Sequence, residues 1–112
     1  MNTLSINVQE LYSSYILNGT KTVEGRLNKG KFAAAQVGDH VLVNDVVEFV
    51  ITGKNQYATF KEMLEQEGVA KVIPDAKSVE EAVQVYYKFY TPEQEKEFGV
   101  VGIKIELFEN FE

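Results

Sequence analysis

Helix starts are the feature of this sequence that most limits its fold. A short polar residue stands three positions before Glu or Gln in four places: Asn7 and Glu10, Thr59 and Glu62, Ser78 and Glu81, Thr91 and Gln94. At this spacing the first side chain accepts from an unpaired amide of the first helical turn, and the second reaches back. The pattern predicts four helices, over about 8–18, 60–67, 79–90 and 92–98.

Between these helices the pattern changes to alternation or to short β-branched runs. Such runs predict strands at 22–27, 40–44, 46–52 and 100–107, with a short strand at 3–7. The Asn44-Asp45 pair favours a tight hairpin. Strands and helices do not alternate regularly, which argues against a doubly wound parallel sheet. We therefore expect an α+β fold, a small, mostly antiparallel β-barrel with flanking helices.

Composition narrows the class of protein. The 112 residues are 45% hydrophobic, enough for one buried core, so we expect a single domain over 1–112. No apolar run approaches the roughly 20 residues that cross a bilayer, and the N-terminus lacks a signal-peptide pattern, so we expect a cytoplasmic protein without membrane contact.

Metal and cofactor sites are not expected. Cysteine is absent, and His40, the single histidine, gives no cluster with zinc-ligand spacing. The sequence also lacks a phosphate-binding loop and a dinucleotide fingerprint. His40 follows a Gly-Asp turn, and we expect it at an exposed strand position.

Charge is distributed unevenly along the chain. The net charge is -6, but residues 1–54 carry five basic and five acidic side chains, so the excess lies in the second half. Residues 19–31 contain one acidic side chain, Glu24, and four basic ones, Lys21, Arg26, Lys29 and Lys31. This segment is either a small cationic site on an acidic protein or an ordinary solvated loop.

The same segment places charged groups on one strand face. Strand alternation puts Glu24 and Arg26 on the same side, whereas Lys21 lies at the junction of helix and strand, where we expect it to be accessible. The fork of Arg26 suits a phosphate or a planar base, and Lys21 would act as a mobile charge. Alternatively, Glu24 and Arg26 form only a surface pair worth at most about 1 kcal/mol. Gly25 leaves the opposite face open to close approach.

The segment from Gly19 to Arg26 resembles the G-x-K-x-x-E-x-R signature of ASCH domains, a branch of the PUA-like superfamily. The order of predicted elements is similar as well. The signature lies between the first helix and the next strand, a Val37-Gly38-Asp39 turn precedes the middle strands, and Phe98-Gly99 leads into the last one. The resemblance covers nearly the whole chain and implies a small β-barrel with flanking helices.

A ligand-binding cleft is the main functional implication of the resemblance. PUA-like domains commonly bind RNA, so we expect RNA or a nucleoside-like small molecule, with Lys21, Glu24 and Arg26 as the polar cleft residues. Lys29 and Lys31 are candidates for phosphate contacts. Tyr90 either stacks on a base or completes the core of the third helix.

A small hydrolase is the alternative. One bacterial branch of the family removes acetyl from N4-acetylcytidine with a lysine, a threonine and a glutamate. Lys21 matches the lysine, but Glu24 stands at the position of the threonine nucleophile, and a carboxylate cannot replace a hydroxyl nucleophile, although it can activate water. Glu67 is the first candidate for the glutamate and Glu65 the second.

Two activities are thus open for an enzyme, an N4-acetylcytidine-type amidohydrolase or a ribonuclease, with Lys21, Glu24 and Glu67 as the catalytic residues. A third hypothesis is a protein-interaction module that contacts a protein partner through the acidic third and fourth helices.

Overall fold

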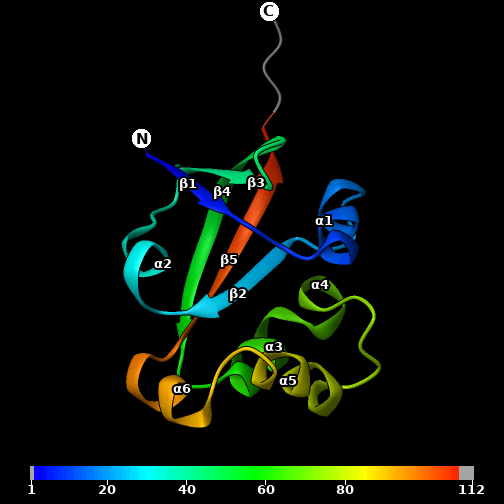
Figure 1. Cartoon of the computed structure of the whole chain (residues 1–112), viewed down its shortest axis with the longest axis vertical. Helices are drawn as coiled ribbons and strands as arrows, with labels where there is room; N and C mark the ends of the chain where they lie inside the picture. The colour runs from blue at the N-terminus through cyan, green and yellow to red at the C-terminus, as the bar shows by residue number, and fades with distance from the viewer. Residues whose placement is uncertain (1, 109–112) are drawn as a thin grey trace, which may run out of the picture.

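The structure is a computed structural model that describes residues 2–108. The strands are β1 (Thr3–Ile6), β2 (Val23–Leu27), β3 (His40–Val43), β4 (Val47–Tyr57) and β5 (Val100–Leu107). The helices are α1 (Glu10–Leu17), α2 (Gly30–Ala34), α3 (Phe60–Glu67), α4 (Val69–Val72), α5 (Val79–Tyr87) and α6 (Pro92–Phe98). Figure 1 shows the sheet flanked by α1 and α2, with the other helices gathered at its lower end. No helix within residues 2–108 is both long and apolar enough to span a bilayer.

The five strands form one curled sheet in the order β1-β3-β4-β5-β2. The β1–β3 pair is parallel, whereas the other three pairs are antiparallel. A register shift between Ile51 and Gly53 interrupts the β4–β5 ladder, and such a bulge bends a strand and increases its twist. The result is a half-barrel with flanking helices, which confirms the predicted α+β, mostly antiparallel architecture.

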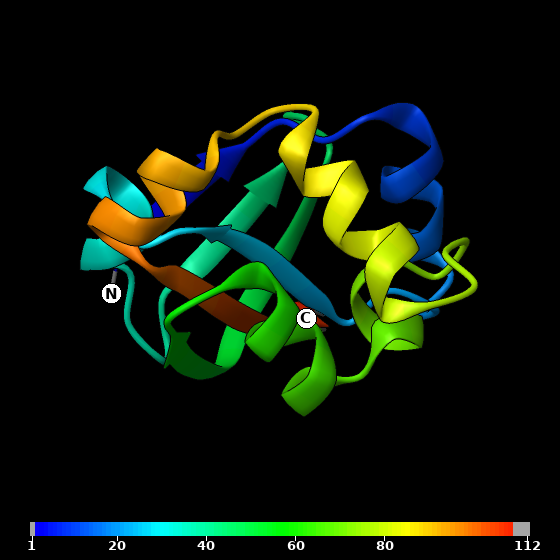
Figure 2. The same ribbon diagram turned by 90° about the horizontal axis from the view of Figure 1, so that it is seen from below.

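Two hydrophobic clusters lie on opposite faces of the sheet. The first fills the inside of the curl, and the second lies between the sheet and the helices α3, α4 and α5. Figure 2 looks onto this helical side and shows α3 and α5 next to β2. On β2, Val23 belongs to the second cluster, whereas Glu24 lies directly across from Ile103 of the first. Glu24 therefore faces the inside of the curl, at the end strand of the sheet.

Three of the predicted helix starts are confirmed by their hydrogen bonds. Thr59 and Ser78 accept from the amides of Glu62 and Glu81 at 3.0 and 3.1 Å. Thr91 and Gln94 form the reciprocal pair of a capping box. The local spacing was sufficient because these bonds involve only residues three positions apart.

The prediction for the first helix start is wrong. The helix begins at Glu10 after Gln9, and no side chain caps it. The side chain of Asn44 instead binds the backbone of Val8, accepting from its amide at 2.8 Å and donating to its carbonyl at 3.2 Å. These two bonds keep the segment before the helix extended. The Asn44-Asp45 turn itself has φ values of 52° and 58°, which fit the predicted tight hairpin.

Several elements differ from the sequence prediction. The short helices α2 and α4, of 5 and 4 residues, were not predicted because they are too short to show helical periodicity. Strand β4 continues to Tyr57 rather than ending at residue 52, because the bulge changes the alternation on which the prediction depended.

His40 is buried rather than exposed, which corrects the expectation from its position after a turn. Its side chain is 10% exposed and contacts Glu48 across the β3–β4 hairpin. Its ring lies 4.4 Å from the ring of Phe108. The aromatic neighbour comes from the far end of the chain, so the local sequence did not reveal it.

Candidate functional site

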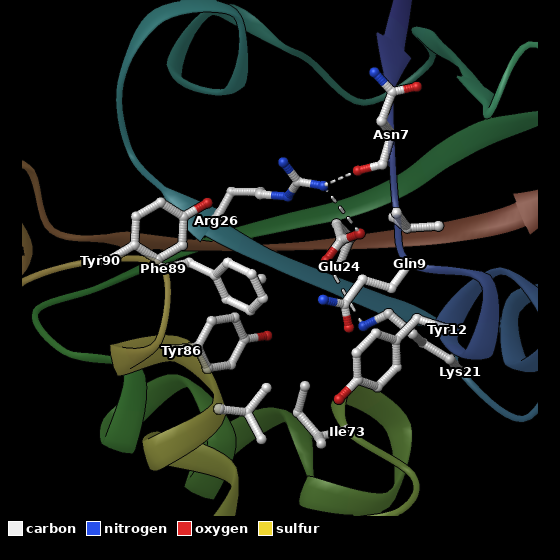
Figure 3. A pocket seen from close by; sticks show the side chains of 13 residues that line it. Asn7, Gln9, Tyr12, Lys21, Glu24, Arg26, Ile73, Tyr86, Phe89 and Tyr90 are labelled. Carbon is white, nitrogen blue, oxygen red and sulfur yellow. Dashed lines mark hydrogen bonds and ion pairs between the residues drawn. The ribbon is translucent and has the colours of Figure 1, made fainter.

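A pocket of about 180 Å³ opens beside the free edge of β2. Its walls come from the β1–α1 loop, α1, β2, the segment after α4, and α5 (Figure 3). The lining residues are Asn7, Val8, Gln9, Tyr12, Lys21, Glu24, Gly25, Arg26, Ile73, Val85, Tyr86, Phe89 and Tyr90. The predicted site residues Lys21, Glu24, Arg26 and Tyr90 therefore meet at one pocket.

Lys21 is buried at the inner end of this pocket, with 3% of its surface exposed. Its Nζ donates to the carbonyls of Val23, at 2.7 Å, and of Val72. Burial lowers the pKa of Lys21; the charge of Arg26 acts in the same direction, and that of Glu24 opposes the shift. The expectation of an accessible, mobile charge is wrong, because the ammonium is held by carbonyls of β2 and α4.

Glu24 lies between two cations. Its Oε1 is 3.7 Å from Lys21 Nζ, and its Oε2 is 3.6 Å from the guanidinium of Arg26. Glu24 Oε2 is buried, and within residues 2–108 no group is close enough to donate a hydrogen bond to it. The predicted pair of Glu24 and Arg26 is therefore present, but at this distance Oε2 makes no hydrogen bond and can still accept one.

Arg26 lies at the mouth of the pocket. It donates to the carbonyl of Asn7 at 3.1 Å, and its guanidinium is 4.8 Å from the ring centre of Phe32. Figure 3 shows the guanidinium between Asn7 and Glu24. A planar group with one face on an aromatic ring still has N–H donors for a ligand at the mouth.

Tyr86 contributes a polar group to the pocket from α5, although sequence analysis did not single it out. Its ring stacks on Phe60 with centres 4.3 Å apart, and its hydroxyl points into the pocket (Figure 3). The hydroxyl is buried and has no hydrogen-bond partner among residues 2–108. Burial, together with the charge of Glu24, raises the pKa of Tyr86 well above its usual value, so the hydroxyl stays protonated.

Gly25 explains how the Tyr86 hydroxyl reaches β2. A Cβ at position 25 would lie 2.5 Å from the Tyr86 hydroxyl oxygen and 2.6 Å from Cε of Met63. The close approach that Gly25 was expected to permit is thus made by a side chain of α5. A glycine flanked by Glu24 and Arg26 was the only local signal for this contact.

Tyr90 packs in the core, as one of its two predicted roles requires, while its stacking on a base stays a prediction. Its ring stacks on Phe60 at 5.6 Å, and the side chain also lines the pocket. The other aromatic lining residues, Tyr12 and Phe89, were not predicted as site residues. Phe89 is 58% exposed.

Lys29 and Lys31 do not line the pocket. Lys29 Nζ lies 4.8 Å from the ring centre of Phe98, and Lys31 donates to the carbonyl of Ser5. Lys31 Nζ also lies 5.5 Å from the ring centre of Phe32, the same ring that the guanidinium of Arg26 contacts. Their contacts with phosphate stay a prediction, and such contacts would require a ligand that extends beyond the pocket.

Glu67 also lies outside the pocket. It is buried at the end of α3, where it accepts from Tyr57 and from Asn55, the latter at 3.2 Å. Lys104 Nζ is 3.9 Å from its other oxygen. Burial, together with the hydrogen bond to Glu67 and the charge of its carboxylate, raises the pKa of Tyr57 to about 12. The structure therefore does not bring Glu67 together with Lys21 and Glu24.

Comparison with known proteins identifies the family. The model of the ASCH domain family matches residues 6–109. This chain belongs to the ASCH domain family. The G-x-K-x-x-E-x-R segment of this ASCH domain therefore lies at the edge strand β2, where it forms one wall of the pocket.

Solved structures agree with this assignment. The crystal structure of the hypothetical protein PH0355 is 40% identical, with a TM-score of 0.92, covering 95% of this chain and 99% of that one. The solution structure of protein PF0455 from Pyrococcus furiosus is 37% identical, with a TM-score of 0.82 and coverage of 96% and 99%. A search of curated proteins gave no significant match.

A more distant structure shows the fold alone. The S128A mutant of ZmASCH from Zymomonas mobilis is 11% identical, with a TM-score of 0.57, covering 94% of this chain and 68% of that one. The curled, mixed five-stranded sheet with flanking helices is thus the PUA-like fold of ASCH domains. No group of three potential metal ligands occurs in the part of the chain that the structure describes.

Proposed function

We propose that this ASCH domain binds a nucleobase, as a free nucleoside or nucleotide or within a short RNA, in the pocket beside β2. The observation that carries the proposal is a pair of buried polar atoms at one pocket, Glu24 Oε2 and the Tyr86 hydroxyl, neither of which has a hydrogen-bond partner within residues 2–108. Buried polar atoms are paired in the great majority of cases, and exceptions are frequent at functional sites. A buried polar atom without a hydrogen bond lowers the stability of the fold, and a ligand that bonds to both atoms would remove this free-energy cost.

The rest of the pocket fits a flat, partly polar ligand. Tyr12, Phe89 and Tyr90 give aromatic surface, while the charged side chains and the Tyr86 hydroxyl supply polar groups around it. This combination is typical of small-molecule sites and of base-stacking sites. The lining has two basic side chains, Lys21 and Arg26, and one acidic side chain, Glu24. The pocket therefore has one more basic than acidic group, although the whole chain is acidic.

Charge also favours one direction for an attached phosphate. A second hollow shares Gln9, Tyr12, Val85 and Phe89 with the pocket, and its other lining residues are Asp75, Glu81, Gln84 and Lys88, so its two carboxylates outnumber its one cation. A phosphate would be repelled there and attracted to Arg26 at the opposite side. The ligand would therefore be short, with its phosphate near Arg26 and the predicted contacts Lys29 and Lys31 beyond it.

The experiment is a titration with the four ribonucleoside 5′-monophosphates and a short oligoribonucleotide, followed by NMR and calorimetry. Arg26→Ala should weaken mononucleotide binding by about tenfold, the effect of losing one charge-assisted hydrogen bond. Lys96→Ala removes a positive charge from α6, outside the pocket, and should leave binding within about twofold. Absence of binding by all the nucleotides, or equal loss in both variants, would exclude the proposal.

Hydrolysis is the second candidate, because the free Oε2 of Glu24 faces the pocket and can accept a proton from water. Lys21 would stabilise the ionised carboxylate rather than act as a nucleophile, since its Nζ is bound to carbonyls of Val23 and Val72. Turnover of N4-acetylcytidine or cleavage of RNA, lost in Glu24→Gln, would support this candidate. Unchanged turnover in that variant would exclude Glu24 as the base.

A further inference from the structure

The free edge of β2 has a defined set of peptide groups. Antiparallel partners alternate between residues that exchange both backbone hydrogen bonds and residues that exchange none. Ile105 donates to the carbonyl of Thr22, and Asn28 donates to that of Gly99, both at 3.0 Å. With the β2–β5 register, these bonds make Glu24 and Arg26 bonded residues, so Val23, Gly25 and Leu27 direct their N–H and C=O groups away from β5.

Two of these three residues have capped carbonyls. The carbonyl of Val23 accepts from Lys21 Nζ at 2.7 Å, and that of Leu27 accepts from the amide of Lys29 at 2.9 Å. Gly25 lies between them and lines the pocket. Within residues 2–108, no side chain or loop bonds to its N–H or C=O.

We propose that the backbone N–H and C=O of Gly25 bind the ligand directly, as a donor next to an acceptor, and that the ligand is a single six-membered ring whose edge has an N–H beside a carbonyl oxygen or a ring nitrogen. This inference rests on the proposed function and adds which edge of the ligand is recognised. Lactams, imides and aminopyrimidines have such an edge. In an antiparallel sheet, a residue on the neighbouring strand would form the same two hydrogen bonds with Gly25, so the ligand edge takes the place of one strand residue.

A peptide strand is a poorer occupant of this edge. Addition of a strand requires free peptide groups at several alternate residues. Here the amide of Thr22 donates to the carbonyl of Lys71, and the carbonyls of Val23 and Leu27 are taken. Only Gly25 presents both groups, which suits a ring rather than a chain.

Neighbouring groups extend the recognition. The Tyr86 hydroxyl approaches Gly25 from one face of β2, and the Glu24 carboxylate lies on the opposite face. The hydroxyl can donate or accept, whereas the ionised carboxylate only accepts. A ring bound at Gly25 would therefore lie between these two groups.

Size decides between one ring and two. A cavity of roughly 150 Å³ holds benzene, and the pocket measures about 180 Å³. A substituted six-membered ring would be enclosed by a pocket of this size, whereas part of a fused two-ring base would project from its open side. We expect pyrimidine nucleosides to bind more tightly than purine nucleosides.

The test compares uridine with two methylated forms of equal size, measured by NMR titration of the whole chain. A 3-methyl group replaces the N–H on the recognised edge and should weaken binding by about tenfold or more, whereas a 5-methyl group leaves that edge intact. The amide proton of Gly25 should shift downfield. The amide of Gly102, which lies directly opposite in β5 and faces β4, is the matched control and should not shift.

The outcomes separate the two proposals. If no nucleoside or nucleotide binds, the proposed function fails. If uridine binds but 3-methyluridine binds equally well, or the Gly25 amide does not move, only the recognition by Gly25 is excluded. Tighter binding of adenosine or guanosine than of uridine would contradict the single-ring ligand.

Discussion

The hydroxyl of Tyr86 lies directly against the Cα of Gly25, so close that a Cβ on residue 25 would be 2.5 Å from the hydroxyl oxygen. The two residues are far apart in sequence, and their contact joins α5 to the edge of β2. Gly25 has no positive φ, so an alanine would suit its backbone. The steric contact alone therefore decides what a substitution does.

Gly25→Ala should displace the Tyr86 hydroxyl and lower the free energy of unfolding by about 1–3 kcal/mol, the usual cost of overpacking. The cost should be smaller in a Tyr86→Phe background, because the nearest atom is then removed. Denaturant unfolding of the two single variants and the double variant measures this coupling. Strictly additive effects would contradict the contact.

Tyr86→Phe separates ligand binding from stability. The hydroxyl has no protein partner, so its removal should leave the free energy of unfolding unchanged or raise it by about 1 kcal/mol. Loss of one hydrogen bond to the ligand should weaken nucleotide binding by about fivefold to tenfold. Chemical denaturation and calorimetry on the same preparation provide both values. A clear loss of stability would mean that the hydroxyl is already paired within the protein.

Local sequence patterns predicted those features that depend on neighbouring residues. The caps at Thr59, Ser78 and Thr91 were found because each joins residues three positions apart. Alternation along β2 correctly placed Glu24 and Arg26 on one face, and the signature correctly indicated the family.

Features made by distant contacts could not be predicted in this way. Lys21 was expected in solvent, as lysines usually are, but one of its acceptors, the carbonyl of Val72, is 51 positions away. The place of Tyr86 in the helical pattern does not show that its hydroxyl reaches a pocket beside β2. Glu67 was the first candidate for the family's catalytic glutamate, whereas the fold places it against Asn55 and Tyr57.

Lys21→Met should be strongly destabilising. It would leave the carbonyls of Val23 and Val72 without their donor and would remove one of the two cations beside Glu24. Breaking a buried pair from one side costs about 3–5 kcal/mol. Lys96→Met, at an exposed position of α6, should change the free energy of unfolding by at most about 0.5 kcal/mol. Equal effects of the two substitutions in denaturant unfolding would show that Lys21 is not held as described.

The contact of Tyr57 with Glu67 predicts a loss of stability in alkali. Tyr57 has a pKa of about 12 in the folded protein, against 10.0 without the fold. Above pH 10 the unfolded chain releases the tyrosine proton while the folded chain retains it, so the unfolded state binds fewer protons and stability falls as pH rises. The contribution of Tyr57 is fully present below pH 10 and is lost as the pH approaches 12.

Tyr57→Phe should therefore flatten the decline of the unfolding free energy between pH 10 and 12. Some decline should remain, because burial also raises the pKa of Tyr86. Glu67→Gln removes the charge that favours the protonated tyrosine, so it should flatten the same decline between pH 10 and 12, the alkaline limb of the stability curve. It should leave nucleotide binding at neutral pH unchanged, because Glu67 lies outside the pocket. If Glu67→Gln abolished binding or turnover without changing the alkaline limb, Glu67 would belong to the functional site after all.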